Sequence, residues 1–192
     1  MAVHIDILHR VTDDELLALS DRNPGYQIER ATDGRLVVSP TRSESGRQSG
    51  EVFLQLGIWN REARAGVVFD ASTGFALPDG SCRSPDASWV RRDRWHALTL
   101  QERSGFAPLC PDAVFEVRSE SDAVDEVHRK MEAYLDNGAR IGVLVDPVSR
   151  GAAVYRTQGP VEHHKGGVKI ALDPELPGFV LDLGPVFGDL SQ

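Results

Sequence analysis

The sequence predicts an α/β (α+β) fold, in which a mixed central β-sheet is flanked by helices and preceded by an N-terminal β-hairpin. A strand, a helix and a strand are expected in series over residues 112–118, 121–138 and 140–146, and such a β-α-β unit makes a parallel strand pair. A hairpin pattern occupies residues 26–40. Further short strand patterns lie on both sides of the β-α-β unit, so parallel and antiparallel pairs are expected in one sheet.

The N-terminal elements follow from a cap and a turn. Thr12, with Glu15 three residues later, forms a capping-box pattern, which predicts a short helix over residues 12–20. Asp33-Gly34 lies between two strand-like runs and is a strong hairpin turn signal. We therefore expect two antiparallel strands within residues 26–40.

The middle of the chain predicts a helix followed by short strands. The spacing of the apolar residues predicts one long helix from Ser43 to about Ala65. Residues 66–92 contain two turn signals and are interpreted as three short strands. Residues 92–111 are interpreted as a helical turn and a loop.

The clearest helix covers residues 121–138. Its apolar residues recur at i, i+3 and i+4, and Asn137-Gly138 ends it. The apolar run at 140–147 has the length of a strand. "AAVYRT" and "GGVKIAL" predict a terminal pair of strands, and "LPGFVLDL" is expected to pack as a tail.

Length and composition are those of an ordinary globular protein. The 192 residues favour a single domain over 1–192, with residues 1–25 as an N-terminal helical extension. No apolar run approaches the roughly 20 residues of a membrane span, and no signal-peptide pattern opens the sequence. Cys82 and Cys110 show no metal-ligand spacing. We expect a cytoplasmic protein with reduced thiols.

The net charge of −8 counts against a free-standing nucleic-acid binder, because the affinity of such proteins comes largely from Lys and Arg on phosphates. The charge does not exclude an enzyme that acts on nucleic acid. Carboxylates gathered to hold a divalent metal also make a chain acidic. The partner is therefore left open by charge alone.

Two charged residues interrupt an apolar strand in "PDAVFEVRSE". Side chains alternate along a strand, so Glu116 and Arg118 point to the same face. A carboxylate can hold a metal and a neighbouring cation can steady a phosphate, which is the pairing that phosphodiester cleavage needs. The alternative is an ordinary salt bridge on a half-exposed strand.

Asp86 follows Pro85 where a turn becomes a strand, 30 residues before Glu116. Pro85-Asp86 and Glu116-Val117-Arg118 together resemble the PD-(D/E)XK nuclease signature. Longer blocks are similar, in order and spacing, to the Uma-type family of restriction-endonuclease-like proteins. They are "LVVSPTRSESGRQSGEVFLQLGIWN", "VVFDASTGFALPDGSCRSPDASWVRR" and "FEVRSESDAVDEVHRKMEAYLDNGARIGVLVDP".

The resemblance implies a restriction-endonuclease-like fold with Asp86 and Glu116 as metal ligands and the Val117 carbonyl as a third oxygen. Glu44 matches an acidic position that related nucleases bring to the metal; alternatively it is an N-terminal helix acid favoured by the helix dipole. Mg²⁺ suits such an all-oxygen set, with Mn²⁺ as the alternative.

One position departs from the signature, because Arg118 stands where the motif has lysine. Arginine stays protonated and stabilises charge, but it is a poor general base. The resemblance implies that the lysine role passes to Lys130 in the following helix. Lys130 falls about 90° from the centre of that helix's apolar stripe, where a solvated flank lysine is the other interpretation. Tyr134 either lines the same cleft or is a core aromatic.

The first functional hypothesis is a metal-dependent endonuclease acting on DNA. Asp86 and Glu116 would hold Mg²⁺, Lys130 would position or activate water, and Arg118 would stabilise charge on the phosphate. A homodimer is expected with it, because duplex cleavage needs two sites. The alternatives are a non-catalytic binding or assembly module on the same fold and a metal-dependent hydrolase of a small phosphoester.

Overall fold

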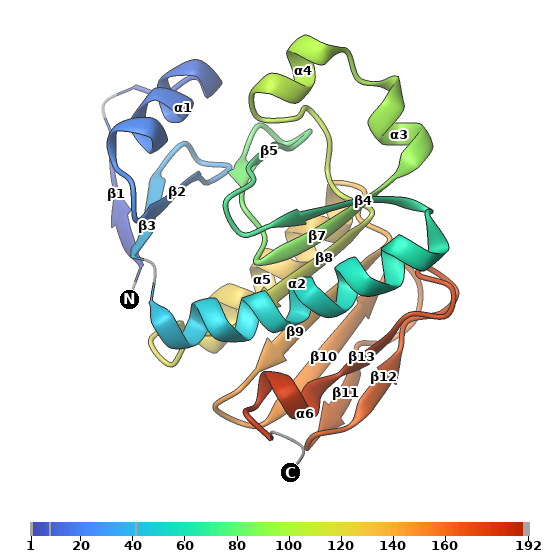
Figure 1. The fold of residues 1–192 in the computed structure, drawn as a ribbon. Helices are drawn as coiled ribbons and strands as arrows, with labels where there is room; N and C mark the ends of the chain where they lie inside the picture. Colours follow the sequence, from blue (N-terminus) through green and yellow to red (C-terminus); the bar gives the residue numbers. More distant parts are fainter. Residues whose placement is uncertain (1, 8, 41, 190–192) are drawn as a thin grey trace.

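The computed structural model of the chain describes residues 2–7, 9–40 and 42–189, and a mixed six-stranded sheet lies at its centre (Figure 1). In spatial order its strands are β11 (Glu162–Lys165), β10 (Gly151–Arg156), β9 (Ile141–Asp146), β8 (Ala113–Val117), β7 (Ala87–Arg91) and β4 (Gly66–Asp70). The β8–β9 pair is parallel, and the other neighbouring pairs of these strands are antiparallel. The predicted fold class is confirmed.

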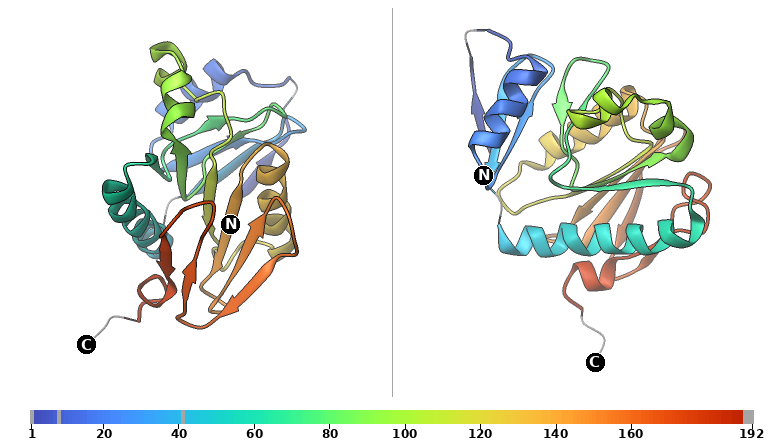
Figure 2. Two further views of the ribbon diagram at one scale, coloured as in Figure 1. Left: turned by 90° about the vertical axis from the view of Figure 1, so that its right-hand side faces the viewer. Right: turned by 45° about the horizontal axis from the view of Figure 1, so that its top comes forward.

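Two helices cover the two faces of this sheet, as the views in Figures 1 and 2 show. Helix α5 (Val124–Asp136) connects β8 to β9, and its Met131 packs in one apolar core with Val114. Helix α2 (Ser43–Ala63) lies on the other face, where Leu56 packs with Phe115. The predicted β-α-β unit and the long helix are both confirmed.

Strand β8 carries a carboxylate into the core on the α5 side. Ala113, Phe115 and Val117 belong to the core under α2, whereas Val114 belongs to the core under α5. Because side chains alternate along a strand, Glu116 shares the α5 face with Val114. Glu116 is only 7% exposed, so its charge must be compensated by neighbouring groups.

A second sheet stands beside the first, with five strands in its described part, in the order β1 (Val3–Ile5), β3 (Leu36–Pro40), β2 (Tyr26–Arg30), β6 (Cys82–Arg83) and β5 (Phe75–Ala76). β2 and β3 form the expected hairpin, and Gly34 takes a φ of 91° in its turn. Helix α1 (Asp13–Arg22) packs on β2 and begins with the predicted capping box of Thr12 and Glu15. Residues 1–25 therefore contain a strand as well as a helix.

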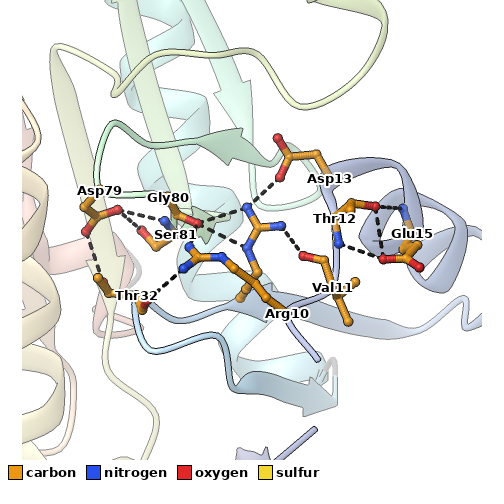
Figure 3. A network of polar contacts seen from close by, with 10 residues as sticks. Arg10, Val11, Thr12, Asp13, Glu15, Thr32, Asp79, Gly80 and Ser81 are labelled. Carbon is orange, nitrogen blue, oxygen red and sulfur yellow. Dashed lines mark hydrogen bonds and ion pairs between the residues drawn. The ribbon is translucent and has the colours of Figure 1, made fainter. Parts of the chain in front are cut away.

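Buried Arg30 fixes β2 to the turn between β5 and β6. Its guanidinium donates to the carbonyl of Val11 at 2.6 Å and to that of Gly80 at 3.0 and 3.1 Å. It also pairs with Asp13 at 2.5 Å. Figure 3 shows Val11, Asp13 and Gly80 in this network. These contacts hold the end of β2 in place, and with it Glu29, the residue before Arg30.

Residues 66–92 form four strands, not the three that we predicted. The chain leaves the second sheet after β6 and enters the central sheet at β7. The last of the three predicted strands is therefore two strands, one in each sheet. The break covers residues 84–86 and contains Asp86. Residues 92–111 contain two short helices, α3 (Arg92–Ala97) and α4 (Leu100–Ser104), rather than one helical turn.

The predicted pairing of the terminal strands is wrong. β10 forms a hairpin with β9, and β11 takes its other edge. β12 (Lys169–Ala171) pairs instead with β13 (Val180–Asp182), because the last apolar segment turns back on it before the short helix α6 (Leu183–Val186). Within the described part of the chain, no helix has the length and apolar character needed to cross a membrane.

Candidate active site

The structure brings Asp86, Glu116, Val117 and Lys130 together around one cavity of about 180 Å³. Asp86 directly precedes β7, which pairs antiparallel with β8 so that Ala87 lies opposite Phe115. This register sets the Asp86 carboxylate against the end of β8. Its Oδ2 accepts a hydrogen bond from the Val117 amide at 2.7 Å. Asp86 and Val117, 31 positions apart in sequence, therefore meet at one strand end.

Two carboxyl groups share this cavity at an electrostatic cost. Burial raises the pKa of Asp86 to about 7, and the charge of Glu116 contributes to the shift. Burial also raises the pKa of Glu116. Like charges held in a weakly solvated space disfavour ionisation of both groups. A divalent cation held by these carboxylates would offset the repulsion between them.

Lys130 reaches this cavity from α5. Its Nζ lies 2.9 Å from Glu116 Oε1 and 3.1 Å from Glu29 Oε1. Burial acts to lower the pKa of Lys130, but the charges of Glu116 and Glu29 outweigh burial and raise it. Lys130 is therefore protonated at neutral pH, and it places a positive charge beside Glu116 and Glu29.

Glu29 is a member of this cluster that the sequence did not single out. It lies on β2 of the second sheet, 7% exposed, and accepts from the Ser84 amide at 2.8 Å. Arg83 lies 3.3 Å from its second oxygen. Burial acts to raise the pKa of Glu29, but Lys130 and Arg83 outweigh it and the pKa is lowered. Glu29 is thus an ionised carboxylate that holds Lys130 together with Glu116.

Tyr134 belongs both to the core and to the site. It is 1% exposed, and its hydroxyl donates to Glu116 Oε1 at 2.8 Å. Burial, followed by the charge of Glu116, raises the pKa of Tyr134 well above its usual value, so the phenol stays protonated as a donor. Of the two interpretations from the sequence, the core aromatic is the one that applies, because other residues line the two cavities beside Glu116. Tyr134 and Lys130, one turn apart on α5, contact the same carboxylate oxygen.

Two of the expected site residues do not join this cluster. Arg118 pairs with Asp146 at 3.0 Å and borders a neighbouring cavity of about 310 Å³ that Glu116 and Lys130 also line. Glu44 lies in the first turn of α2, where its exposed side chain pairs with Arg47 at 2.7 Å. Its position agrees with the helix-start interpretation.

The donor atoms at this site suit a hard cation. Among the described residues, no group of three or more His, Cys, Asp and Glu side chains is arranged to hold a metal ion. The set present is two carboxylates, Asp86 and Glu116, beside the Val117 backbone. Mg²⁺ is usually bound by one or two carboxylates and keeps several of its waters. The residues therefore fit Mg²⁺ better than a metal that needs a complete protein cage.

A mixed sheet with Asp86 just before β7, Glu116 on β8 and Arg118 directly after it resembles that of a nuclease-like protein of the restriction-endonuclease type. The chain belongs to the Uma2 family, described as "Putative restriction endonuclease", whose model matches residues 13–184. The predicted family is confirmed.

A solved structure with the same fold is the crystal structure of "a putative nuclease belonging to DUF820" from Anabaena variabilis. It superposes with a TM-score of 0.72 at 19% identity, over 93% of this chain and 98% of that chain. At this identity the likeness establishes the fold alone. No curated protein matches the chain.

Proposed function

We propose that the chain is a metal-dependent endonuclease that hydrolyses phosphodiester bonds, with DNA as its substrate. The observation that carries the proposal is the pair of carboxyl groups, Asp86 and Glu116, held in one cavity beside protonated Lys130. Membership of the Uma2 family supports a nuclease. DNA as substrate, a cytoplasmic location and a homodimer are parts of the proposal.

Asp86, Glu116 and the carbonyl of Val117 would hold Mg²⁺ or Mn²⁺. Such an ion, when bound, lowers the pKa of a coordinated water and neutralises charge on phosphate oxygens. Asp86 would have to be ionised to hold the ion, because only the carboxylate form binds. Tyr134 fixes the orientation of Glu116 through the hydroxyl that donates to Oε1.

Lys130 provides positive charge for a phosphate oxygen. Its ammonium group cannot accept a proton from water at neutral pH, so electrostatic stabilisation is the role that suits it. Glu29 would keep the ammonium group in the cavity if Glu116 served as a metal ligand. Arg118, at the rim of the neighbouring cavity, would contact a flanking phosphate once it leaves Asp146. We assign Glu44 no ligand role.

Cleavage of supercoiled plasmid and of single-stranded DNA with added Mg²⁺ or Mn²⁺ tests this function. We expect cleavage by the wild type, none with EDTA, and losses of at least about 100-fold in Asp86→Asn and Lys130→Met, within the range for removal of one charge-stabilising group. Glu44→Gln is the matched control and should cleave as the wild type does. Full cleavage by Asp86→Asn would refute the site. Binding without cleavage by the wild type would favour the non-catalytic module.

A further inference from the structure

A larger cavity, of about 620 Å³, adjoins the candidate active site. It lies between α1 and β2 on one side and α2 and the turn after β4 on the other. Gln27, Ser49 and Asp86 line both this cavity and the smaller one that holds Glu116 and Lys130. We call the larger cavity the side cleft. One end of a ligand bound in the side cleft would therefore lie beside Asp86, next to the cavity that holds Glu116.

Aromatic side chains line the side cleft. Tyr26, on the first position of β2, is 53% exposed, and Phe53, on α2, is 36% exposed. Phe106 is the third aromatic residue of its wall. Exposed aromatic side chains that gather in one concavity mark a binding site more often than singly scattered apolar residues do.

The charge of the side cleft is unsuited to phosphate. Its described lining includes Asp21, Asp70 and Asp86 and no lysine or arginine. A phosphate backbone is bound through Lys and Arg, so neither a duplex nor a strand's phosphates should occupy it. The occupant that suits it is flat, apolar on its faces and uncharged.

We propose that the side cleft binds one unpaired nucleobase of the strand whose phosphate lies at Asp86 and Glu116, with Tyr26 and Phe53 as stacking side chains. This inference rests on the proposed nuclease function and names its substrate class. The volume is within the range of roughly 300–1,000 Å³ that accommodates a small molecule. A base enters such a pocket only from a single strand or after leaving its stack. The substrate is therefore single-stranded or locally unpaired nucleic acid.

Binding of a short single-stranded oligodeoxynucleotide that carries one fluorescent base analogue tests this inference. The measurement is made in EDTA, so that binding is separated from cleavage, and is repeated with the same strand annealed to its complement. We expect the analogue's fluorescence to be quenched by the wild type with the single strand and not with the duplex. Tyr26→Ala and Phe53→Ala should each weaken binding by about 5- to 150-fold, the range for loss of one stacked base.

The matched control is Leu54→Ala, because Leu54 is a neighbour of Phe53 on α2, is 52% exposed and does not line the side cleft. It should bind the single strand as the wild type does. Equal binding by Phe53→Ala and Leu54→Ala, no binding by the wild type, or equal binding of the duplex would overturn the inference.

Failure of the side cleft and failure of the proposed function are distinguishable. If the wild type cleaves in a metal-dependent manner and Tyr26→Ala and Phe53→Ala bind and cleave normally, the proposed nuclease function stands and the proposed base site is overturned. Binding that depends on Tyr26 and Phe53 in a protein that cleaves no nucleic acid would uphold the base site without the hydrolysis.

Discussion

Replacement of Glu29 by glutamine removes one of the two negative charges that hold Lys130. The wild-type carboxylate accepts from Lys130 at 3.1 Å, from Arg83 at 3.3 Å and from the Ser84 amide at 2.8 Å. Glutamine keeps nearly the same volume, and its amide oxygen can still accept from Ser84. The variant therefore tests the charge of Glu29 and leaves its packing nearly unchanged.

The loss of that charge should lower the free energy of unfolding by about 2–3 kcal/mol. Breaking a buried ion pair by removing one partner costs about 3–5 kcal/mol, because it leaves a buried charge uncompensated. The cost should be smaller for Glu29→Gln, because Lys130 keeps Glu116 at 2.9 Å and the Arg83 side chain is 16% exposed. Lys130 would then pair with Glu116 alone and compete more strongly with a metal ion for that carboxylate.

Urea unfolding near neutral pH measures the stability change, and calorimetry measures Mn²⁺ affinity. Glu44→Gln is the matched control, since it makes the same change in an exposed pair with Arg47 and should cost little. A double-mutant cycle of Glu29→Gln with Lys130→Met should show coupling, as expected for two residues in contact. Equal stability of Glu29→Gln and Glu44→Gln, with unchanged Mn²⁺ affinity, would refute the positioning role of Glu29.

Four further outcomes are expected. Asp86 must lose its proton to bind metal, so Mn²⁺ affinity measured by calorimetry should rise with pH and level off above about pH 7. The affinity on this plateau should be about 100-fold higher than the affinity two pH units below the pKa of Asp86, and binding should release protons. An affinity that does not change with pH would contradict this. In the metal-free protein, folding favours the neutral form of Asp86, so the contribution of Asp86 to the free energy of unfolding should fall as pH rises from 3.8 through about 7; urea titrations of the wild type and of Asp86→Asn at several pH values check the sign. Tyr134→Phe, which removes the donor to Glu116 at 2.8 Å, should lower stability by about 1 kcal/mol and slow cleavage, and unchanged rates would dismiss its orienting role. Arg30→Met should lower the free energy of unfolding by about 2–4 kcal/mol in the same urea assay, because the carbonyl acceptors of Arg30 lose their donor. A smaller loss than that of Glu44→Gln would contradict the role of Arg30 in fixing β2.

The elements that depend on local signals were predictable from the sequence. The capping box at Thr12, the hairpin turn at Gly34 and the apolar stripe of α5 each lie within a few residues of the chain, and the structure has all three. Short strands such as β5 and β6 depend on partners from distant segments instead. Two residues carry too little pattern to show which sheet they join, so the crossing at residues 84–86 was missed.

The candidate site was predictable where the family signature covers it. Asp86, Glu116, Val117 and Lys130 do meet around one cavity, although their metal-binding and catalytic roles stay predictions. Glu29 was missed because its partner Lys130 lies 101 residues away and neither residue has a local cue for the other.

One signal for Glu29 was present in the sequence. Successive Glu29 and Arg30 end a strand, where alternation turns one of them toward each face. Both are buried, at 7% and 5% exposed. Two buried charges on opposite faces require a partner on each face, and Lys130 and Asp13 are among those partners.

Mn²⁺ binding by calorimetry to the wild type, Asp86→Asn and Glu116→Gln tests the metal site most directly. We expect binding by the wild type and its loss in both variants, with circular dichroism showing that each variant is folded. Both substitutions keep side-chain volume, so the loss would follow from the missing carboxylates. Unchanged affinity in both folded variants, or no binding by the wild type even with a single-stranded oligodeoxynucleotide present, would contradict a metal site at Asp86 and Glu116.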